Sequence, residues 1–191
     1  MEIIFARHCQ TAWNAVGRIQ GTSDIPLNAE GRRQAKDLAK RLSAVKISKV
    51  YSSHLSRAIE TAQNVKNSPL GFVILDMRLR ECDFGALNGM TKEDVDARYG
   101  PTFWKELKTQ RGWADDYSFA DLGGENRAQV LGRQLAFLDE LVAKSGNAND
   151  DGFPVVIGHG RSLGTLLHHL GHPTVVLEQG FYEIVRYPKG R

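Results

Sequence analysis

Five residues of the sequence have side chains suited to one kind of chemistry, and each stands at or shortly after the end of a predicted strand: Arg7, His8, Arg57, Glu81 and His159. Arginine binds phosphate through a planar fork of N–H groups and stays charged at any working pH. Neighbouring positive charge favours a neutral histidine, and a neutral imidazole is a nucleophile. A carboxyl group can protonate a departing alkoxide. Together these residue types indicate phosphoryl transfer through a phosphohistidine.

Short strands and amphipathic helices alternate along the chain and would position these residues. Strands are predicted at 2–6, 49–53, 71–76, 153–160 and 180–187, and helices at 28–45, 53–65, 125–144 and 161–171. Asn28 is a suitable N-cap for the first of these helices. We therefore expect an α/β fold, a three-layer sandwich with a mainly parallel central sheet and helices on both faces. Ligands of such folds bind beyond the carboxyl ends of the strands, so the five residues would meet on one rim.

The length of 191 residues suits a single domain, residues 1–191, with a sizeable core. The pattern becomes irregular and aromatic at about 90–120, which contains Tyr99, Phe103, Trp104 and Trp113. We interpret this stretch as a helical, lid-like insert over the opening of the site.

Composition excludes several classes of protein. Apolar residues make up 41% of the chain and charged residues 25%, and the net charge is only +3, without a basic run, so we expect no nucleic-acid partner. No segment approaches the roughly 18 apolar residues that span a bilayer, and no targeting signal is visible. Cys9 and Cys82 form no CxxC pair. We expect a cytoplasmic protein that acts on a small phosphorylated substrate, with a homodimer possible.

Several sequence blocks resemble those of one family, in the same order. RHCQTAWN (7–14) is similar to the R-H-G-[EQ]-T-x-x-N signature of the histidine phosphatase superfamily, the phosphoglycerate-mutase-like proteins. Later blocks that resemble the family are RIQGTSDIPLNAEGRRQA, SSHLSRAIETA, LRECDFGALNG, GGEN and VVIGHG. The resemblance covers roughly residues 3–163 and is weakest at 90–120.

The resemblance implies a role for each site residue. His8 would be the phosphorylated nucleophile, and Glu81 the general acid that later activates water. The transferring phosphoryl group would be bound by Arg7, Asn14, Arg57, His159 and Gly160, with Arg18 and Gln20 as lesser candidates at the pocket wall. The family implies neither a metal nor another cofactor, because arginine and histidine supply the stabilising charge.

The sequence departs from the family pattern at two positions. Cys9 replaces the usual glycine after the nucleophile. We expect its thiol to turn away from the phosphate and pack as a small apolar group, the alternative being a reactive thiolate in the pocket. Arg161 follows the His-Gly pair; we expect it at the surface, starting a helix, the alternative being a further cation near the site.

Three other kinds of site fit the sequence less well: a serine hydrolase active site, a dinucleotide-binding loop and a metal site. Residues 160–164 match the G-x-S-x-G elbow of serine hydrolases, but no histidine follows His172 to complete the Ser-acid-His order. The spacing of GHGRSLG differs from the dinucleotide-binding G-x-G-x-x-G. The histidines 168, 169 and 172 lack an accompanying carboxylate or cysteine cluster, so we interpret them as structural rather than as metal ligands.

Within the family, we expect a metal-independent phosphatase that hydrolyses small phosphate monoesters. The alternatives are a phosphoglycerate mutase and a non-catalytic binding module on the same fold. The mutases resemble longer chains with a larger lid, for which 191 residues leave little room. A binding module would have lost at least one of the five residues. Sugar phosphates, phosphoglycerate, phosphoserine and nucleotide-related monoesters all remain open as substrates.

Overall fold

A five-stranded sheet forms the centre of the molecule in the computed structural model, which describes residues 1–65, 72–103, 116–145, 152–173 and 177–188. The strands are β1 (Glu2–Arg7), β2 (Ile47–Ser52), β3 (Val73–Leu75), β4 (Phe153–Gly158) and β5 (Tyr182–Arg186). They lie side by side in the order β3-β2-β4-β1-β5. All neighbouring pairs are parallel except β1 and β5, which are antiparallel.

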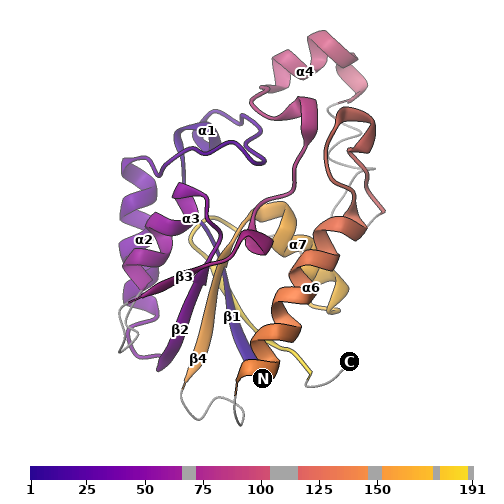
Figure 1. Ribbon diagram of the computed structural model, residues 1–191. Coiled ribbons are helices and arrows are strands. Elements are labelled where there is room, and N and C mark those ends of the chain that lie inside the picture. Colours follow the sequence, from indigo (N-terminus) through magenta and orange to yellow (C-terminus); the bar gives the residue numbers. More distant parts are fainter. Residues whose placement is uncertain (66–71, 104–115, 146–151, 174–176, 189–191) are drawn as a thin grey trace.

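Helices cover both faces of this sheet (Figure 1). Helices α2 (Ala29–Arg41) and α3 (Ser56–Val65) lie on one face, and α6 (Arg127–Lys144) and α7 (Gly160–His169) lie on the other. The structure thus has the three-layer α/β architecture predicted from the alternation of strands and helices, and that prediction is confirmed.

The strand sequences explain why two apolar cores form. Successive side chains of a strand point to opposite faces. In β1, Ile3 and Phe5 therefore join the core beneath α6 and α7, whereas Ile4 and Ala6 join the core beneath α2 and α3. All four are fully buried, as expected for a strand covered on both faces.

Local sequence signals fix where two of the helices begin. Asn28 caps α2 as predicted, since its side-chain oxygen accepts a hydrogen bond of 2.8 Å from the Gly31 N–H. Helix α6 begins with a capping box, in which the side chains of Asn126 and Gln129 each accept from the backbone N–H of the other.

Shorter elements lie at the carboxyl end of the sheet. They are helices α1 (Ala12–Ala15) and α4 (Lys92–Tyr99) and the 3-10 turns η1 (Met77–Leu79), η2 (Gly85–Leu87) and η3 (Ala120–Leu122). Figure 1 shows α1 and α4 beyond the strand ends. Helix α4 falls within the predicted insert, and the Tyr99 ring stacks on that of Phe103 with their centroids 4.8 Å apart. Trp104 and Trp113 lie outside the described residues.

In the described part of the chain, no helix has the length and hydropathy needed to cross a membrane.

Candidate active site

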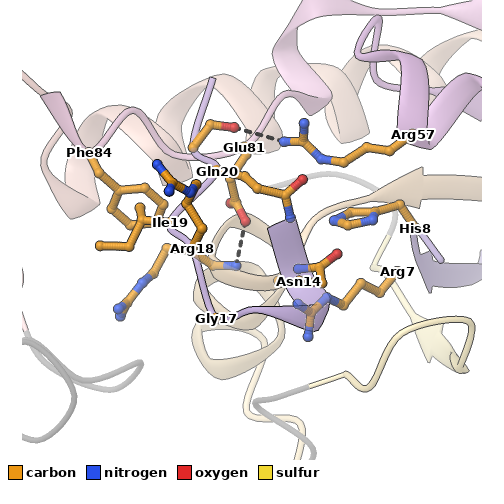
Figure 2. Close-up of a pocket in the computed structure, with 13 residues that line it drawn as sticks. Arg7, His8, Asn14, Gly17, Arg18, Ile19, Gln20, Arg57, Glu81 and Phe84 are labelled. Carbon is orange, nitrogen blue, oxygen red and sulfur yellow. Dashed lines mark hydrogen bonds between the residues drawn. The ribbon is translucent and has the colours of Figure 1, made fainter. Parts of the chain in front are cut away.

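A cavity of about 460 Å³ opens at the carboxyl ends of the strands. Its walls come from the end of β1 and the loop after it, from α3, from the segment after η1 and from the start of α7. The lining residues are Arg7, His8, Asn14, Gly17, Arg18, Ile19, Gln20, Gly21, Arg57, Glu81, Phe84, Gly160 and Arg161. Figure 2 shows Arg7, His8 and Arg57 on one side and Arg18, Ile19 and Phe84 on the other. Every predicted site residue lines this cavity except His159, which lies against His8.

His8 directly follows β1, and its ring has a defined tautomer. Nδ1 lies 2.7 Å from the backbone oxygen of Cys9. Because a carbonyl oxygen only accepts, the ring proton must be on Nδ1, which leaves a lone pair on Nε2. Burial, Arg57 and Arg7 lower the pKa of His8 well below its usual value. The ring is therefore neutral at pH 7, with Nε2 available as a nucleophile.

Arg57 is fully buried and holds the second histidine. Its Nε donates to Nδ1 of His159 over 3.2 Å, and its two terminal nitrogens donate to the backbone oxygens of Ser23 and Gly21, each over 2.7 Å. Burial lowers the pKa of Arg57 to about 10, so the side chain stays charged at pH 7. These contacts fix one cation at the side of the cavity that contains His8.

His159 follows β4 and lies next to the nucleophile candidate. The rings of His8 and His159 have their centroids 5.1 Å apart. Since Nδ1 of His159 accepts from Arg57, its proton is on Nε2. That Nε2 is buried and has no hydrogen-bond partner among the described residues. Burial and Arg57 lower the pKa of His159, so it is a neutral donor for an oxygen atom placed beside His8.

Arg7 is the last residue of β1, and a glycine makes room for it. One of its terminal nitrogens donates to the Leu177 backbone oxygen over 2.9 Å, while its buried Nε has no partner in the described part of the chain. A Cβ atom at Gly160 would come within 3.1 Å of the Arg7 guanidinium carbon. Any larger residue at position 160 would therefore crowd the Arg7 side chain, which would have to shift by a few tenths of an ångström.

Glu81 lies at the N-terminus of α7. Its Oε1 accepts from the backbone N–H groups of Cys82 (2.9 Å) and Ser162 (2.8 Å), and its Oε2 accepts from that of Arg161 (3.0 Å). Helix N-termini favour negative charge. A carboxylate offers about four lone-pair positions, so one position on Oε2 is left over. Oε2 is the atom on which this side chain can carry a proton.

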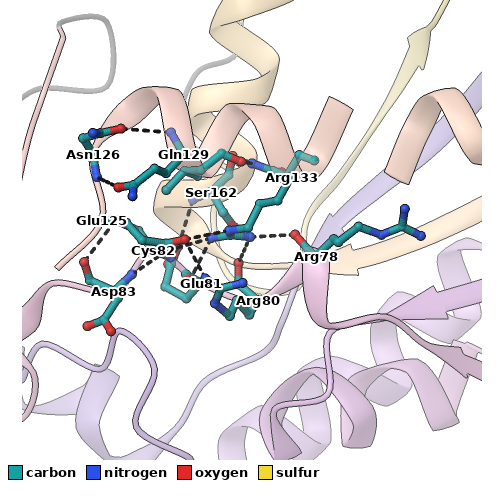
Figure 3. Close-up of polar contacts among 12 residues, drawn as sticks. Arg78, Arg80, Glu81, Cys82, Asp83, Glu125, Asn126, Gln129, Arg133 and Ser162 are labelled. Atoms are coloured by element: carbon teal, nitrogen blue, oxygen red, sulfur yellow. Dashed lines mark hydrogen bonds and ion pairs between the residues drawn. The ribbon is translucent and has the colours of Figure 1, made fainter. Parts of the chain in front are cut away.

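A second set of charged residues, distant in sequence, holds the segment that contains Glu81 (Figure 3). Arg133 on α6 donates to the backbone oxygens of Arg78 (2.6 Å), Arg80 (2.8 Å) and Glu81 (3.1 Å). Glu125 accepts from Arg133 at 3.0 and 3.1 Å and from the Asp83 backbone N–H at 3.0 Å. Neither Arg133 nor the role of Glu125 was predicted from the sequence. The GGEN block, which contains Glu125, drew attention to that residue but did not indicate that Arg133 is its partner.

Asn14, Gln20 and Arg18 lie in the loop after β1. The Asn14 side-chain oxygen accepts from Thr11, whose hydroxyl also donates to the Gln20 oxygen over 2.9 Å. The amide nitrogens of Asn14 and Gln20 are thus the atoms that remain to contact a ligand. Arg18 donates to the Gly89 backbone oxygen and lies over the Trp13 ring, 5.4 Å from its centroid.

The expectation that Arg161 lies at the surface is wrong. Its exposure is 8%, and it lines the cavity. The guanidinium carbon lies 5.0 Å from the centroid of the buried Tyr117 ring, an attractive cation–π geometry. The sequence could not show this contact, because Tyr117 lies 44 residues earlier, within the predicted insert.

The Cys9 side chain packs as expected. It is fully buried and belongs to a small apolar cluster with Leu27 and Ala35, and it is absent from the cavity lining. Burial raises the pKa of its thiol to about 11. The pocket-facing, reactive thiolate is therefore the wrong alternative.

Across the described ranges, no group of three or more His, Cys, Asp or Glu side chains could hold a metal ion. The arrangement instead offers a neutral imidazole nucleophile, buried arginines and a carboxyl group around one cavity. That set of groups is suited to binding a tetrahedral anion and transferring it to nitrogen.

The chain is similar to known proteins of one family. The model of the histidine phosphatase superfamily (branch 1) matches residues 3–178. Phosphoserine phosphatase 1 of Hydrogenobacter thermophilus is 34% identical over 83% of this chain and 71% of its own. A probable phosphoglycerate mutase of Proteus mirabilis is 32% identical over 87% of this chain and 73% of its own. The structure of a mycobacterial glucosyl-3-phosphoglycerate phosphatase in complex with VO3 aligns with a TM-score of 0.76 and 33% identity, covering 88% of this chain and 81% of that one.

Proposed function

Because the chain belongs to the histidine phosphatase superfamily, confirming the resemblance of its motifs, we propose that it is a phosphatase that hydrolyses small phosphate monoesters through a phosphohistidine at His8. One observation carries this proposal. The Nδ1–H group of His8 is held by the Cys9 carbonyl, so Nε2 presents its lone pair in a cavity that also contains Arg7 and Arg57. Two relatives are named as phosphatases, which supports hydrolysis.

In the first step, Nε2 of His8 attacks phosphorus and the P–O bond to the leaving group breaks. Glu81 donates its proton to the departing oxygen, so an alcohol leaves and Glu81 becomes a carboxylate. Arg7, Arg57 and the Nε2–H group of His159 stabilise the charge on the non-bridging oxygens. Asn14 and Gln20 contribute neutral amide donors from the loop after β1.

In the second step, water attacks phosphorus and the P–N bond to His8 breaks. Glu81 accepts the proton of that water and returns to its starting state. Inorganic phosphate leaves. The stabilising charges are side chains of the protein throughout, and we therefore propose that turnover requires no metal ion.

The test of this function is phosphate release from a panel of phosphate monoesters, with and without excess chelator. We expect equal turnover in both conditions, complete loss in the His8→Ala variant, and trapped phosphate on wild-type protein that is acid-labile and base-stable. Phosphoserine and glucosyl-3-phosphoglycerate, for which two relatives are named, belong in the panel. Activity that chelator abolishes and Mg²⁺ or Zn²⁺ restores would contradict the mechanism.

A mutase is the second candidate, because one relative is named as a probable phosphoglycerate mutase. The two functions differ in the fate of the phosphohistidine. A phosphatase releases phosphate to water, whereas a mutase returns the phosphoryl group to the glycerate. We expect phosphate release from 3-phosphoglycerate to exceed its isomerisation, even with 2,3-bisphosphoglycerate as primer.

A further inference from the structure

One peptide group next to His8 makes hydrogen bonds on both of its sides. Its oxygen, on Cys9, accepts from Nδ1 of His8 over 2.7 Å, and its N–H, on Gln10, donates to the Gln34 side chain over 3.0 Å. Because the C=O and N–H groups of a planar trans peptide point in opposite directions, Gln34 lies on the side away from His8. A chain of hydrogen bonds thus runs from the imidazole ring to α2.

The direction of each hydrogen bond in this chain is fixed. A backbone N–H only donates and a carbonyl oxygen only accepts, so the Gln34 atom in contact must be its amide oxygen. The amide nitrogen of Gln34 accordingly faces a carboxylate oxygen of Glu30, at 3.3 Å. His8 is 2% exposed and Cys9 is fully buried, and in such surroundings the hydrogen bonds of a chain polarise one another. The acceptor on Gln34 therefore makes the Cys9 carbonyl a stronger acceptor for the ring proton.

Helix α2 is docked on Gln10 by further contacts. The Asn28 backbone N–H donates to the Gln10 backbone oxygen over 3.1 Å, and the Asn28 side-chain amide donates to the Gln10 side chain over 2.9 Å. A Cβ atom at Gly31 would come within 1.9 Å of the Gln10 backbone oxygen, so glycine lets the helix approach this closely. Gln34 follows Gly31 by three residues and lies on the same face of α2. Asn28, Gly31 and Gln34 are absent from the cavity lining, and the function proposed above gives them no role.

A second helix fixes the preceding peptide group. The N–H of Cys9 donates to the Thr61 hydroxyl over 3.1 Å, and that hydroxyl donates to the Arg57 backbone oxygen over 2.8 Å. Thr61 is fully buried on α3. Since Thr61 fixes the peptide on one side of Cys9, the direction of the Cys9 carbonyl depends on the contact with Gln34.

We propose that Gln34 is a positioning residue that acts through the Cys9–Gln10 peptide to keep the proton of His8 on Nδ1 and the lone pair on Nε2. This inference rests on the nucleophilic role proposed for His8. A neutral imidazole can carry its proton on either nitrogen, and a ring protonated at Nε2 has no lone pair there to attack phosphorus.

The same contact also acts during the first chemical step. The electron pair of Nε2 forms the P–N bond, the P–O bond to the leaving group breaks, and positive charge appears on the imidazole ring. The hydrogen bond from Nδ1–H to the Cys9 carbonyl then becomes charge-assisted and stronger. Loss of the Gln34 acceptor should therefore lower kcat rather than weaken substrate binding.

The position of the ring proton can be measured by ¹⁵N NMR of protein labelled on its histidines, because protonated and unprotonated ring nitrogens differ in chemical shift. The His8 signals are identified by their absence from the His8→Asn variant. In the wild-type protein at pH 7 we expect the proton on Nδ1. In Gln34→Met, which keeps the length of the side chain but has no amide oxygen, we expect a measurable fraction of the form protonated on Nε2.

Steady-state kinetics supplies the second measurement. Gln34→Met should lower kcat about tenfold, the effect of one hydrogen bond, and change KM less than about twofold, because Gln34 does not touch the substrate. The loss should be the same for alkyl phosphates and p-nitrophenyl phosphate, since His8 attacks both. Gln34→Glu keeps an oxygen acceptor, and it should restore the proton on Nδ1 and a kcat within about threefold of the wild-type value.

Gln129 offers a matched control at the start of α6. Its side-chain oxygen also accepts from a backbone N–H, that of Asn126, over 2.9 Å, and it is absent from the cavity lining. Gln129→Met should lower stability in urea denaturation, as Gln34→Met does, but leave kcat and the His8 signals unchanged.

The outcomes separate this inference from the proposed function. A wild-type His8 with its proton on Nε2, or a Gln34→Met variant with wild-type His8 signals, would overturn it, whether or not kcat falls. If Gln34→Met does not fold, Gln34→Asn takes its place, because its side chain is one bond too short to reach the Gln10 N–H. Failure to hydrolyse any phosphate monoester would overturn the proposed function, whereas the His8 signals would still decide whether Gln34 positions the ring proton.

Discussion

The Glu81 side chain accepts hydrogen bonds from three backbone N–H groups. Its proposed role as general acid predicts that the effect of a substitution depends on the leaving group of the substrate. We expect Glu81→Gln to lower the rate for alkyl phosphates by about 10²–10⁴-fold. The loss on p-nitrophenyl phosphate should be far smaller, because that leaving group barely needs a proton. Steady-state kinetics on both substrates measures the difference.

Arg57→Ala provides the contrast to Glu81→Gln. Arg57 lies on the His8 side of the cavity and donates to His159, so its loss should damage both substrates alike. A thermal melt of each variant checks that it is folded. Equal losses on the two substrates in Glu81→Gln would argue against a general acid at this position.

Cys9 immediately follows the proposed nucleophile His8, yet its burial predicts an unreactive thiol. With its pKa raised to about 11, the thiolate fraction at neutral pH is very small, so iodoacetamide should inactivate the protein slowly. The rate should not depend on added phosphate, and Cys9→Gly should keep most of the activity. Rapid inactivation that phosphate prevents and that Cys9→Gly abolishes would contradict the packed position of this side chain.

Among the helices, α6 holds the segment of the proposed general acid Glu81 through Arg133. The Arg133 side chain is 10% exposed and its partner Glu125 is 12% exposed, so removing one of them leaves a buried charge with fewer partners. We expect Arg133→Met to destabilise the fold by about 3 kcal/mol. It should also lower kcat more for alkyl phosphates than for p-nitrophenyl phosphate, as a displaced Glu81 would.

The matched control for Arg133 is an exposed ion pair on another helix. Arg33 on α2 pairs with Glu30 and Asp37 and is 64% exposed. Arg33→Met should cost less than about 1 kcal/mol and leave the kinetics unchanged. Urea denaturation gives both free energies. A similar, small cost for the two variants would show that the contacts of Arg133 do not hold the segment that contains Glu81.

For the protein as a whole, two buried neutral histidines make stability depend on pH. The pKa values of His8 and His159 are both lowered in the folded protein, whereas unfolded histidines titrate near pH 6.5. The unfolded chain therefore binds more protons than the folded chain below about pH 7, and the free energy of unfolding must fall as the pH falls. The protonation of the unfolded chain limits this loss to at most about 2 kcal/mol per ring between pH 7 and pH 5.

Denaturant titrations in phosphate-free buffer at pH 5, 6 and 7 measure this effect. The His8→Asn/His159→Asn double variant removes both rings, so its stability should change much less over the same interval. A double variant with the same pH dependence as the wild-type protein would assign the effect to other groups.

The parts of this structure that were predictable from sequence depend on local signals. The apolar runs predict the strands and helices, and Asn28 predicts where α2 begins. Parallel strands bring their carboxyl ends to the same edge of the sheet, even where the predicted end of a strand differs from the observed end by one or two residues. That is why Arg7, His8 and Glu81 could be grouped from the sequence alone. β3 is shorter than predicted, which is consistent with its place at the edge of the sheet, where it pairs on one side.

The parts that were not predictable depend on contacts between distant segments. The Arg161 side chain is held against the Tyr117 ring. The segment that contains Glu81 is held by Arg133 on α6, which donates to three of its carbonyl groups. The residues of each contact are far apart in the sequence at no regular spacing, so no periodic pattern predicts the contact.

The position of β1 in the sheet also determines when the site can form during synthesis. The strand that leads into His8 is made before both of its neighbours in the sheet, β4 and β5, and Ile4 pairs with Val155 and Ile184. A nascent chain that has not yet reached Phe153 thus has no partner for either edge of β1. Such long sequence separation slows folding, and the exposed apolar strand is open to aggregation until then. Residues 2–7 are therefore an apolar segment whose two edges stay unpaired until β4 and β5 have been made.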